Sequence, residues 1–300
     1  MSSSSPLVSV IMNCYNGEKY LRKAIDSVIT QTYTNWEIIF WDNQSTDGSA
    51  NIFNKIDNNR LKYFYAPFHS TLYSARNHAI KKSKGDFIAF LDVDDYWIST
   101  KLELQVSLFT DKKIGLVYSN FFWKNEIKGL NYIAHKKKLP SGFVLDDILK
   151  GYNVGLLTII VRRSALLRVQ PPFNSKYNII GDYDMTTRLA VDWKFGVIQT
   201  PTAYCRWHGG NLQIIEQGRQ IHELCEWIAL SSKNYKISQN KEFVKLGSNI
   251  KRMKSVYEAQ NGNYLYSIKS FFKIPGLKNK LKIITAIILP KAIFNKITGR

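Results

Sequence analysis

Two acidic clusters in the first third of the chain have the residue types and spacing of a site for a charged ligand. They are the segments 41–48 and 90–95, which contain Asp42, Asp47, Asp92, Asp94 and Asp95. Each segment includes the end of an apolar run typical of a buried parallel strand, and open α/β sheets bind ligands at the carboxyl ends of such strands. Carboxylates gathered there repel one another unless a cation or a ligand's donors offset the charge. A hard divalent cation bound to a substrate diphosphate would do so, which indicates a nucleotide-dependent transferase.

Two common nucleotide-binding motifs are absent from the sequence. No G-x-G-x-x-G follows the first predicted strand and no G-x-x-x-x-G-K-[ST] occurs anywhere, so dinucleotide oxidoreductases and P-loop enzymes fit poorly. The turn after the first strand contains Tyr15, Asn16 and Gly17 instead, which can present backbone groups and an aromatic face to a base. Asn and Gly favour turns for conformational reasons, so this turn alone is weak support.

The elements that position these clusters are predicted from hydrophobic periodicity. Apolar runs predict strands at Leu7–Met12, Trp36–Trp41, Leu61–Tyr65 and Asp86–Leu91. Helical spacing predicts helices at Glu18–Gln31 and Tyr73–Ser83. Asn16 is expected to cap the first helix, and Thr46 or Asp47 the helix after the second strand. Repeated strand–helix–strand units imply right-handed crossovers. The predicted fold is therefore α/β, with a doubly wound, mostly parallel, Rossmann-like sheet.

The pattern is looser after Asp95. Helices are predicted at Thr100–Thr110 and Asp182–Val191, and strands at Gly115–Trp123, Leu156–Val161 and Phe195–Gln199. The polar and basic stretch 124–140 is expected to be a hairpin or a mobile loop, and the chain from Glu216 onward is expected to be helical.

Four segments together resemble the N-terminal half of family 2 glycosyltransferases, which have the GT-A fold. They are Val8–Leu21, Trp36–Ser49, Ser74–Asn77 and Phe87–Trp97, in the family's order and at about its spacing. The resemblance implies a GT-A domain at 1–215, with a nucleotide-binding half at 1–97 and an acceptor half at 98–215, before a basic helical extension at 216–300. It also implies inverting transfer from a nucleoside-diphosphate sugar to an acceptor hydroxyl, with Mg²⁺ or Mn²⁺ as cofactor.

The resemblance assigns donor-binding roles to the first acidic cluster and to the turn near it. Asp42 would accept hydrogen bonds from the nucleobase, and the turn with Cys14, Tyr15, Asn16 and Glu18 would flank that base. The family commonly has a second acid at position 43 and proline at position 13, where this chain has Asn43 and Asn13. Neither change removes an expected metal ligand, but the preferred base of the donor (UDP, dTDP or GDP) stays open.

The second cluster matches the family's D-x-D motif at Asp92-Val93-Asp94. The resemblance places Asp92 near the ribose or the metal and makes Asp94 the direct metal ligand. Alternation puts both side chains on one side if the chain stays extended. The alternative is a turn-and-cap cluster before a helix near Ser99. Arg76 would add a fixed positive charge near the nucleotide, unless it is a cation on a helix surface.

Inversion requires a base that takes the proton of the attacking acceptor hydroxyl. The segment Gly181–Leu189 resembles the family's E-D-x-x-x-x-x-R-L, in which the second acid is the base, so the candidate is Asp182. Gly181 stands where the family has the first acid. Asp182 could instead be a helix N-cap, Asp184 is a rival for the role, and Arg188 either pairs with one of these acids or is exposed.

A basic segment ends the resemblance. His208, after Arg206 and Trp207, matches a histidine that could complete the metal shell or contact the diphosphate, or could be structural. Processive synthases of the family have Q-x-x-R-W and transmembrane helices. Here Ala203 replaces the glutamine and no apolar run is long enough to span a bilayer, which favours a single-addition enzyme.

Composition and charge limit where such a protein acts. The three cysteines are widely spaced, which fits a reducing compartment, and no signal peptide is visible, so a cytoplasmic location is expected. The net charge is +19, and no Asp or Glu follows Glu258. Apolar residues and lysines interleave between Phe271 and Leu289, which suits a helix on an anionic membrane surface or one that packs on the catalytic domain.

The sequence therefore predicts an inverting glycosyltransferase at the inner face of the cytoplasmic membrane. The acceptor is expected to be a glycan or a polyprenyl-linked intermediate of bacterial polysaccharide, O-antigen or capsule synthesis. The alternative is a non-catalytic nucleotide-sugar or polyanion-binding module on the same fold. A nucleic-acid-binding protein is disfavoured, because no recognised module accompanies the basic charge.

Overall fold

The computed structural model describes residues 5–208, 216–289 and 293–294. The chain divides into two compact units, Met1–Asn211 and Leu212–Arg300. The predicted boundary between 215 and 216 adjoins the segment 209–215, which lies outside the described residues. Within the parts of the chain that the structure describes, the helices are too short or too polar to cross a bilayer.

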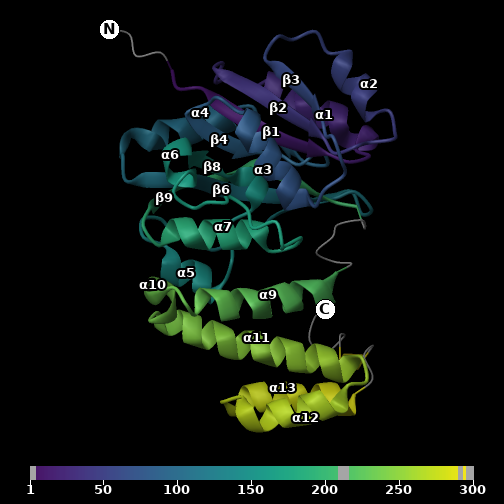
Figure 1. Ribbon diagram of the computed structural model, residues 1–300, viewed down its shortest axis with the longest axis vertical. Helices are drawn as coiled ribbons and strands as arrows, with labels where there is room; N and C mark the ends of the chain where they lie inside the picture. Colours follow the sequence, from purple (N-terminus) through teal and green to yellow (C-terminus); the bar gives the residue numbers. More distant parts are fainter. Residues whose placement is uncertain (1–4, 209–215, 290–292, 295–300) are drawn as a thin grey trace. The chain divides into compact units, whose positions relative to one another are not determined.

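The first unit begins with alternating strands and helices, as the hydrophobic pattern predicts (Figure 1). The elements are β1 (Val8–Cys14), α1 (Glu18–Ile29), β2 (Trp36–Asp42), α2 (Ser49–Asn54), β3 (Leu61–Tyr65), α3 (Leu72–Lys82) and β4 (Phe87–Phe90). The strands β2 and β4 pair with β1 in parallel, and β3 pairs in parallel with β2.

The rest of the first unit extends this sheet and adds shorter helices. The elements are β5 (Tyr96–Trp97), α4 (Lys101–Val106), η1 (Ser107–Thr110), β6 (Ile114–Asn125), β7 (Leu130–Ile133), α5 (Leu145–Lys150), η2 (Leu156–Thr158), β8 (Ile160–Arg162), α6 (Arg163–Leu166), α7 (Gly181–Ala190) and β9 (Lys194–Trp207). The nine-stranded sheet of the described residues has the order β3-β2-β1-β4-β8-β6-β9-β5, and β7 pairs with β6. Strand β8 is antiparallel to both β4 and β6, while β6 and β9 are parallel. The predicted α/β class is confirmed, with a mixed sheet beyond β4.

Two predictions for the second half need correction, and one is confirmed. The apolar run Leu156–Val161 is a 3₁₀ turn followed by the short strand β8. The last strand, predicted at Phe195–Gln199, runs on to Trp207, because buried polar side chains such as Thr202 and Arg206 continue it without an apolar pattern. The hairpin expected in the stretch 124–140 is confirmed, because β7 pairs antiparallel with the end of β6.

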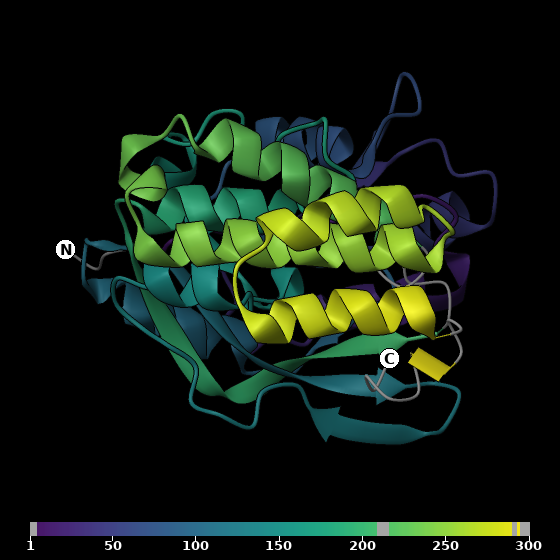
Figure 2. The same cartoon turned by 90° about the horizontal axis from the view of Figure 1, so that it is seen from below.

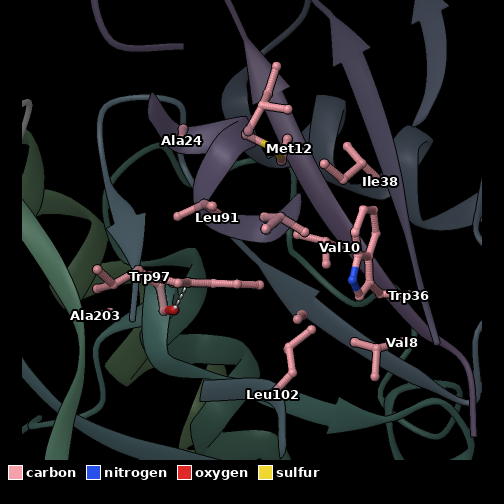
Figure 3. Close-up of a cluster of buried hydrophobic side chains, with 14 of the residues drawn as sticks. Val8, Val10, Met12, Ala24, Trp36, Ile38, Leu91, Trp97, Leu102 and Ala203 are labelled. Atoms are coloured by element: carbon pink, nitrogen blue, oxygen red, sulfur yellow. Dashed lines mark hydrogen bonds between the residues drawn. The ribbon is translucent and has the colours of Figure 1, made fainter. Parts of the chain in front are cut away.

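The core of the first unit lies between α1 and one face of β1 and β2. Val8, Val10 and Met12 of β1 point into this core with Trp36 and Ile38 of β2 (Figure 3). Strand residues two apart share a face, whereas helix α1 buries apolar residues three or four apart, namely Leu21, Ala24, Ile25 and Val28. Helix α3 contacts β1 and β2 and buries Ala75 and Ala79, so it covers the opposite face of these strands.

The second unit is helical in its described residues. It consists of α9 (Gln217–Ser231), α10 (Tyr235–Ser238), α11 (Lys241–Gln260), α12 (Tyr264–Lys273) and α13 (Leu277–Ile288). The helices α12 and α13, yellow in Figure 2, both pack on α11. The N-caps of α10, α11 and α12 are Asn234, Asn240 and Asn263, whose side chains each accept a backbone N–H of the first turn.

Candidate active site

Parallel pairing brings the ends of three strands to one edge of the sheet. In the register, Cys14 of β1 lies beside Asp42 of β2, and Ile11 of β1 lies beside Phe90 of β4. The turn after β1, Asp42 at the end of β2, and the D-x-D segment after β4 therefore lie at the same edge. This edge is where an open α/β sheet binds its ligand.

The turn after β1 is tied to the loop after β2 by long-range hydrogen bonds. Asn16, which has a positive φ of 54°, accepts the backbone N–H of Thr46 at 2.8 Å and donates its own to Ser45 Oγ at 3.0 Å. Its side chain does not cap α1, whose N-cap is Gly17. The predicted cap was wrong because the Asn16 amide reaches the neighbouring loop instead of the first turn of its own helix.

Glu18 and Asp47 join the starts of helices α1 and α2. Asp47 accepts the backbone N–H of Glu18 at 2.9 Å and that of Ser49 at 3.0 Å. The Glu18 carboxylate accepts the N–H of Gly48 at 2.8 Å in return. The N-cap of α2 is Gly48, so neither Thr46 nor Asp47 occupies the cap position, although Asp47 satisfies an N–H at the start of each helix.

The aromatic face of the turn is open, whereas its thiol is not. Tyr15 is 56% exposed and lies against His69, with ring centroids 4.5 Å apart. Cys14 is buried in the apolar core, and burial raises the pKa of its thiol. A ligand at this edge can therefore contact the Tyr15 ring.

Asp42 is fully buried and already has two hydrogen-bond partners. One carboxylate oxygen accepts the backbone N–H of Ser45 at 2.7 Å, and the other accepts the hydroxyl of Tyr63, also at 2.7 Å. Burial, and then the bond to Asp42, raise the pKa of Tyr63. A nucleobase would have to share the remaining lone pairs of this carboxylate, so the base-binding role of Asp42 stays a prediction.

The D-x-D segment is a tight turn and not the extended chain that the alternation argument assumed. The backbone N–H of Asp95 donates to the carbonyl of Asp92 at 3.1 Å, which reverses the chain between β4 and β5. The turn lies close to the β1–α1 connection, since a Cβ at Gly17 would be 2.7 Å from Val93 Cγ2. The three acids of this turn, Asp92, Asp94 and Asp95, each contact a different residue.

Each of these acids is paired with a basic residue. Asp92 forms an ion pair with Arg76, and Asp94 Oδ2 lies 3.1 Å from His208 Nε2. Asp95 accepts the backbone N–H of Arg206 at 2.9 Å. Burial, and then repulsion from Asp92, raise the pKa of Asp94, whereas His208 opposes the rise. Burial, and then repulsion from Asp94 and Asp92, raise the pKa of Asp95 still further.

The donor set at this turn fits a hard divalent cation. Among the described residues, no group of three or more His, Cys, Asp or Glu side chains has the geometry of a metal site. Mg²⁺ uses one or two carboxylates together with substrate phosphates and waters, so such a cage is not required. Asp94 and Asp92 supply carboxylate oxygens beside His208, and their mutual repulsion is what a cation would offset.

Arg76 is buried and reaches the D-x-D turn from helix α3. Only 3% of the residue is exposed, which excludes the alternative of a surface cation. Its guanidinium pairs with Asp92 and lies 5.1 Å from the centre of the Tyr73 ring, one helical turn earlier. Burial lowers the pKa of Arg76, but the charge and hydrogen bond of Asp92, together with Tyr73 and Asp182, outweigh this effect and the pKa is raised.

Asp182 lies on α7, and the same helix α3 reaches it through Tyr73. The Tyr73 hydroxyl is 3.3 Å from Asp182 Oδ1, and the Tyr152 hydroxyl is 3.3 Å from Oδ2. Burial raises the pKa of Asp182, although the backbone N–H of Tyr183, the charge of Arg76 and both tyrosine hydroxyls oppose the rise. The N-cap of α7 is Ile180, so the alternative that Asp182 is the cap was wrong.

Asp184, the rival of Asp182, is engaged elsewhere. Its carboxylate forms an ion pair with Arg188 at 2.7 Å, and Arg188 also donates to the carbonyls of Val169, Pro171 and Pro172. This network anchors the loop before α7. Arg188 is therefore paired, one of the two outcomes left open by the sequence.

Sequence reasoning missed several residues around this site. Tyr73 could have been found, because it lies three residues before Arg76 and so shares its helix face. No pattern indicates Tyr152, which lies in the loop after α5, or Tyr63 on β3. Asn13 is 8% exposed, and neither polar atom of its amide has a hydrogen-bond partner in the part of the chain that the structure describes.

The fold and the site together define an α/β protein of the GT-A class. The family "Glycosyl transferase family 2" matches residues 9–166, which is more than half of the chain. The chain belongs to this family.

Relatives with assigned names share this part of the chain. The UDP-Glc:alpha-D-GlcNAc-diphosphoundecaprenol beta-1,3-glucosyltransferase WfgD of Escherichia coli is 36% identical over 170 residues, which cover 57% of this chain and 66% of WfgD. TuaG of Bacillus subtilis (strain 168) is 32% identical over 195 residues, covering 64% of this chain and 74% of TuaG. The match to WfgD thus spans just under two thirds of that relative.

Solved structures show the same fold at low sequence identity. The S. aureus TarS 1–349 complex with UDP-GlcNAc has a TM-score of 0.61 at 17% identity, covering 93% of this chain and 90% of that one. The mannosyltransferase PcManGT from Pyrobaculum calidifontis, in complex with GDP-Man and Mn²⁺, has a TM-score of 0.62 at 16% identity, covering 99% and 84%. These similarities confirm the predicted GT-A-like fold.

Proposed function

We propose that this protein transfers a sugar from a nucleoside-diphosphate sugar to an acceptor hydroxyl with inversion at the anomeric carbon. The observation that supports this most is that one helix contacts both groups of acids. On α3, Arg76 pairs with Asp92 of the D-x-D turn, and Tyr73 lies within hydrogen-bond distance of Asp182. Donor binding and acceptor activation require such groups around one reacting carbon.

In the proposed reaction, Asp182 is the general base. Its carboxylate takes the proton of the acceptor hydroxyl while that oxygen forms its bond to the anomeric carbon. The bond from this carbon to the donor's diphosphate oxygen breaks, and the nucleoside diphosphate leaves with the electron pair. Asp42 and the turn from Cys14 to Glu18 would hold the nucleoside. Arg76 would hold Asp92 in place beneath the diphosphate.

A divalent cation is proposed at the D-x-D turn. Asp94, with Asp92 and His208 beside it, would hold Mg²⁺ or Mn²⁺. When bound, such an ion offsets the negative charge that develops on the departing diphosphate. The Mn²⁺ named in the PcManGT complex supports this proposal by analogy only.

The names of the relatives suggest the substrates. WfgD and a second Escherichia coli relative, WfaP, are named as transferring from UDP-Glc to alpha-D-GlcNAc-diphosphoundecaprenol. We propose a UDP-sugar donor, with UDP-glucose as the first to test and dTDP- and GDP-sugars as the alternatives. The proposed acceptor is a polyprenyl-diphosphate-linked glycan of bacterial surface-polysaccharide synthesis.

A transfer assay with a panel of donors and a GlcNAc-diphospholipid acceptor tests this function. Asp94→Ala should abolish metal-dependent turnover, whereas Asp182→Asn should keep donor binding and lower transfer by roughly 100- to 10,000-fold. Asp26→Asn is the matched control, because Asp26 is an exposed carboxylate paired with Arg22 on α1. Equal transfer by the Asp182 variant and the parent would refute the base assignment. Donor binding without transfer by the parent protein would favour the non-catalytic alternative.

We also propose that the second unit contacts an anionic membrane, which would place the protein at the inner face of the cytoplasmic membrane. Exposed apolar side chains lie one helical turn apart along α12 and α13, namely Tyr264, Leu265, Ile268, Phe272, Leu277, Leu281, Ile284 and Ile288. Lysines on the same two helices are also exposed, among them Lys269, Lys273, Lys278 and Lys282. Apolar stripes flanked by lysines suit an interface rich in anionic lipid.

Vesicle sedimentation tests the membrane proposal. The protein should bind phosphatidylglycerol-containing vesicles more than pure phosphatidylcholine vesicles, and added salt should weaken the binding. Phe272→Glu with Leu277→Glu should reduce it, since each residue is 75% exposed. Leu130→Glu on β7 is the matched control, at 58% exposure. Concentration-dependent self-association that the double variant abolishes, without vesicle binding, would assign the stripes to a second copy of the chain and refute the proposal.

A further inference from the structure

We propose that Tyr73 and Tyr152 are positioning residues that hold the Asp182 carboxylate, so that Oδ2 is the atom that receives the acceptor's proton. This inference rests on the proposed role of Asp182 as the base. Tyr73 is buried and Tyr152 is half-buried, and each hydroxyl lies within hydrogen-bond distance of the carboxylate, one from α3 and one from the loop after α5. Neither belongs to the motifs that identify the family in this sequence.

The two carboxylate oxygens of Asp182 have different surroundings. Oδ1 accepts the backbone N–H of Tyr183 at 2.8 Å and lies 3.3 Å from the Tyr73 hydroxyl. Oδ2 has the Tyr152 hydroxyl at 3.3 Å as its partner. A carboxylate oxygen has two lone-pair sites, so Oδ1 has a donor within reach of each site. Among the described residues Oδ2 has one such donor, which leaves a site for the acceptor hydroxyl.

The Tyr73 hydroxyl has a single proton and three neighbours. It can donate to the carbonyl of Ile179 at 3.1 Å or to Asp182 Oδ1 at 3.3 Å, and it accepts the backbone N–H of Asp182 at 3.3 Å. It therefore fixes the backbone at the start of α7 as well as one carboxylate oxygen. The ring itself is held by Phe173, whose centroid is 5.2 Å away, and by Arg76.

Gly181 leaves the space that the Tyr73 ring occupies. A Cβ at residue 181 would lie 2.5 Å from Cε2, 2.6 Å from Cδ2 and 2.7 Å from Cγ of this ring. The position where the family motif has an acid is here filled by the ring of Tyr73. The base is thus oriented by tyrosine hydroxyls, and its charged neighbour is the buried Arg76, which also pairs with Asp92.

These contacts predict how each hydroxyl affects the base. A hydrogen bond donated to a carboxylate favours its charged form and lowers its pKa. Removing the Tyr152 hydroxyl takes away the donor of Oδ2, so the pKa of Asp182 should rise. Removing the Tyr73 hydroxyl should raise it less, because Ile179 competes for that proton. The other groups that face Asp182, Arg76 and the backbone N–H of Tyr183, stay unchanged in both variants.

The test compares Tyr152→Phe and Tyr73→Phe in the full chain with the parent enzyme and Asp182→Asn. Each Phe variant should lower kcat by roughly 10- to 100-fold while the donor KM stays unchanged, since small misplacements of a reacting group have effects of this size. The acid limb of kcat/KM should move to higher pH, and further for Tyr152→Phe than for Tyr73→Phe. Tyr118→Phe is the control, because its buried hydroxyl donates to Pro140 at 2.6 Å and does not contact Asp182.

The outcomes separate this inference from the proposed function. If Asp182→Asn loses transfer while both Phe variants keep the parent kcat and pH profile, the positioning role is refuted and the base assignment stands. If Asp182→Asn transfers normally, the base assignment fails and the inference fails with it. A loss of kcat without any shift of the acid limb, matched by Tyr118→Phe, would show general structural damage and refute the positioning role.

Discussion

Replacing Gly181 by alanine should destabilise the protein, against the usual effect of this change in a helix. An alanine Cβ would come within 2.7 Å of three carbons of the Tyr73 ring. The ring is 3% exposed and stacks on Phe173, so it cannot withdraw. Such overpacking costs about 1–3 kcal/mol. The entropic gain of Gly→Ala offsets roughly 0.4–1 kcal/mol of this. With the middle of each range, the expected net loss is about 1.3 kcal/mol, or roughly 3–5 °C in Tm.

Denaturant titration of a double-mutant cycle measures this contact directly. In a Tyr73→Ala background the ring carbons are absent, so Gly181→Ala should keep only its entropic gain of roughly 0.4–1 kcal/mol. The coupling between the two sites should then equal the overpacking cost of about 1–3 kcal/mol. Gly151→Ala is the matched control, because no heavy atom lies within 4 Å of a Cβ built there. Additive effects of Gly181→Ala and Tyr73→Ala would refute the steric reasoning.

Three more predictions concern stability and pH. Burial lowers the pKa of Lys101 well below its ordinary value, so above that lowered pKa the unfolded chain binds more protons than the folded one. In denaturant titrations, stability should rise with pH relative to Lys101→Met, by up to about 1.4 kcal/mol per unit, as the pH approaches the ordinary pKa of lysine. Burial raises the pKa of Asp182, so the stability that its protonated carboxyl contributes is lost as pH rises through that pKa. Asp182→Asn should therefore unfold at higher denaturant concentration than the parent near neutral pH, and the difference should vanish in acid. Asp47→Ala leaves the N–H groups of Glu18 and Ser49 without their acceptors and should lower the free energy of unfolding by about 1–4 kcal/mol in the same denaturant titration. A loss no larger than that of an Asp→Ala change at an exposed position would contradict this prediction.

The sequence alone predicted the elements that lie under the proposed donor-binding part of the site. Strands such as β1 and β2 are buried on both faces, so their apolar runs are unambiguous, and β3 has the predicted bounds. Parallel pairing then requires Asp42 and Asp92 to lie at one edge of the sheet. The class of fold and the approximate place of the ligand follow from these two facts.

The details of the site depend on contacts between residues far apart in the sequence. Asn16 bonds to Thr46, thirty residues away, and the local pattern indicated only a helix cap. The D-x-D segment suits an extended chain as well as a turn, and the bond from Asp95 to Asp92 decides between them. Tyr152 comes within reach of Asp182 only because α5 packs on α7, which no periodicity encodes.

The fit between Gly181 and Tyr73 has a consequence for recombination within the family. A chimaera that joins residues 1–97 of this chain to the acceptor half of a relative with an acid at position 181 would put a long side chain where the Tyr73 ring lies. The reverse chimaera would leave Gly181 without the ring that covers it if the relative has no aromatic residue at position 73. Exchanges of donor specificity should therefore move residues 73 and 181 together, although 108 positions separate them in the sequence.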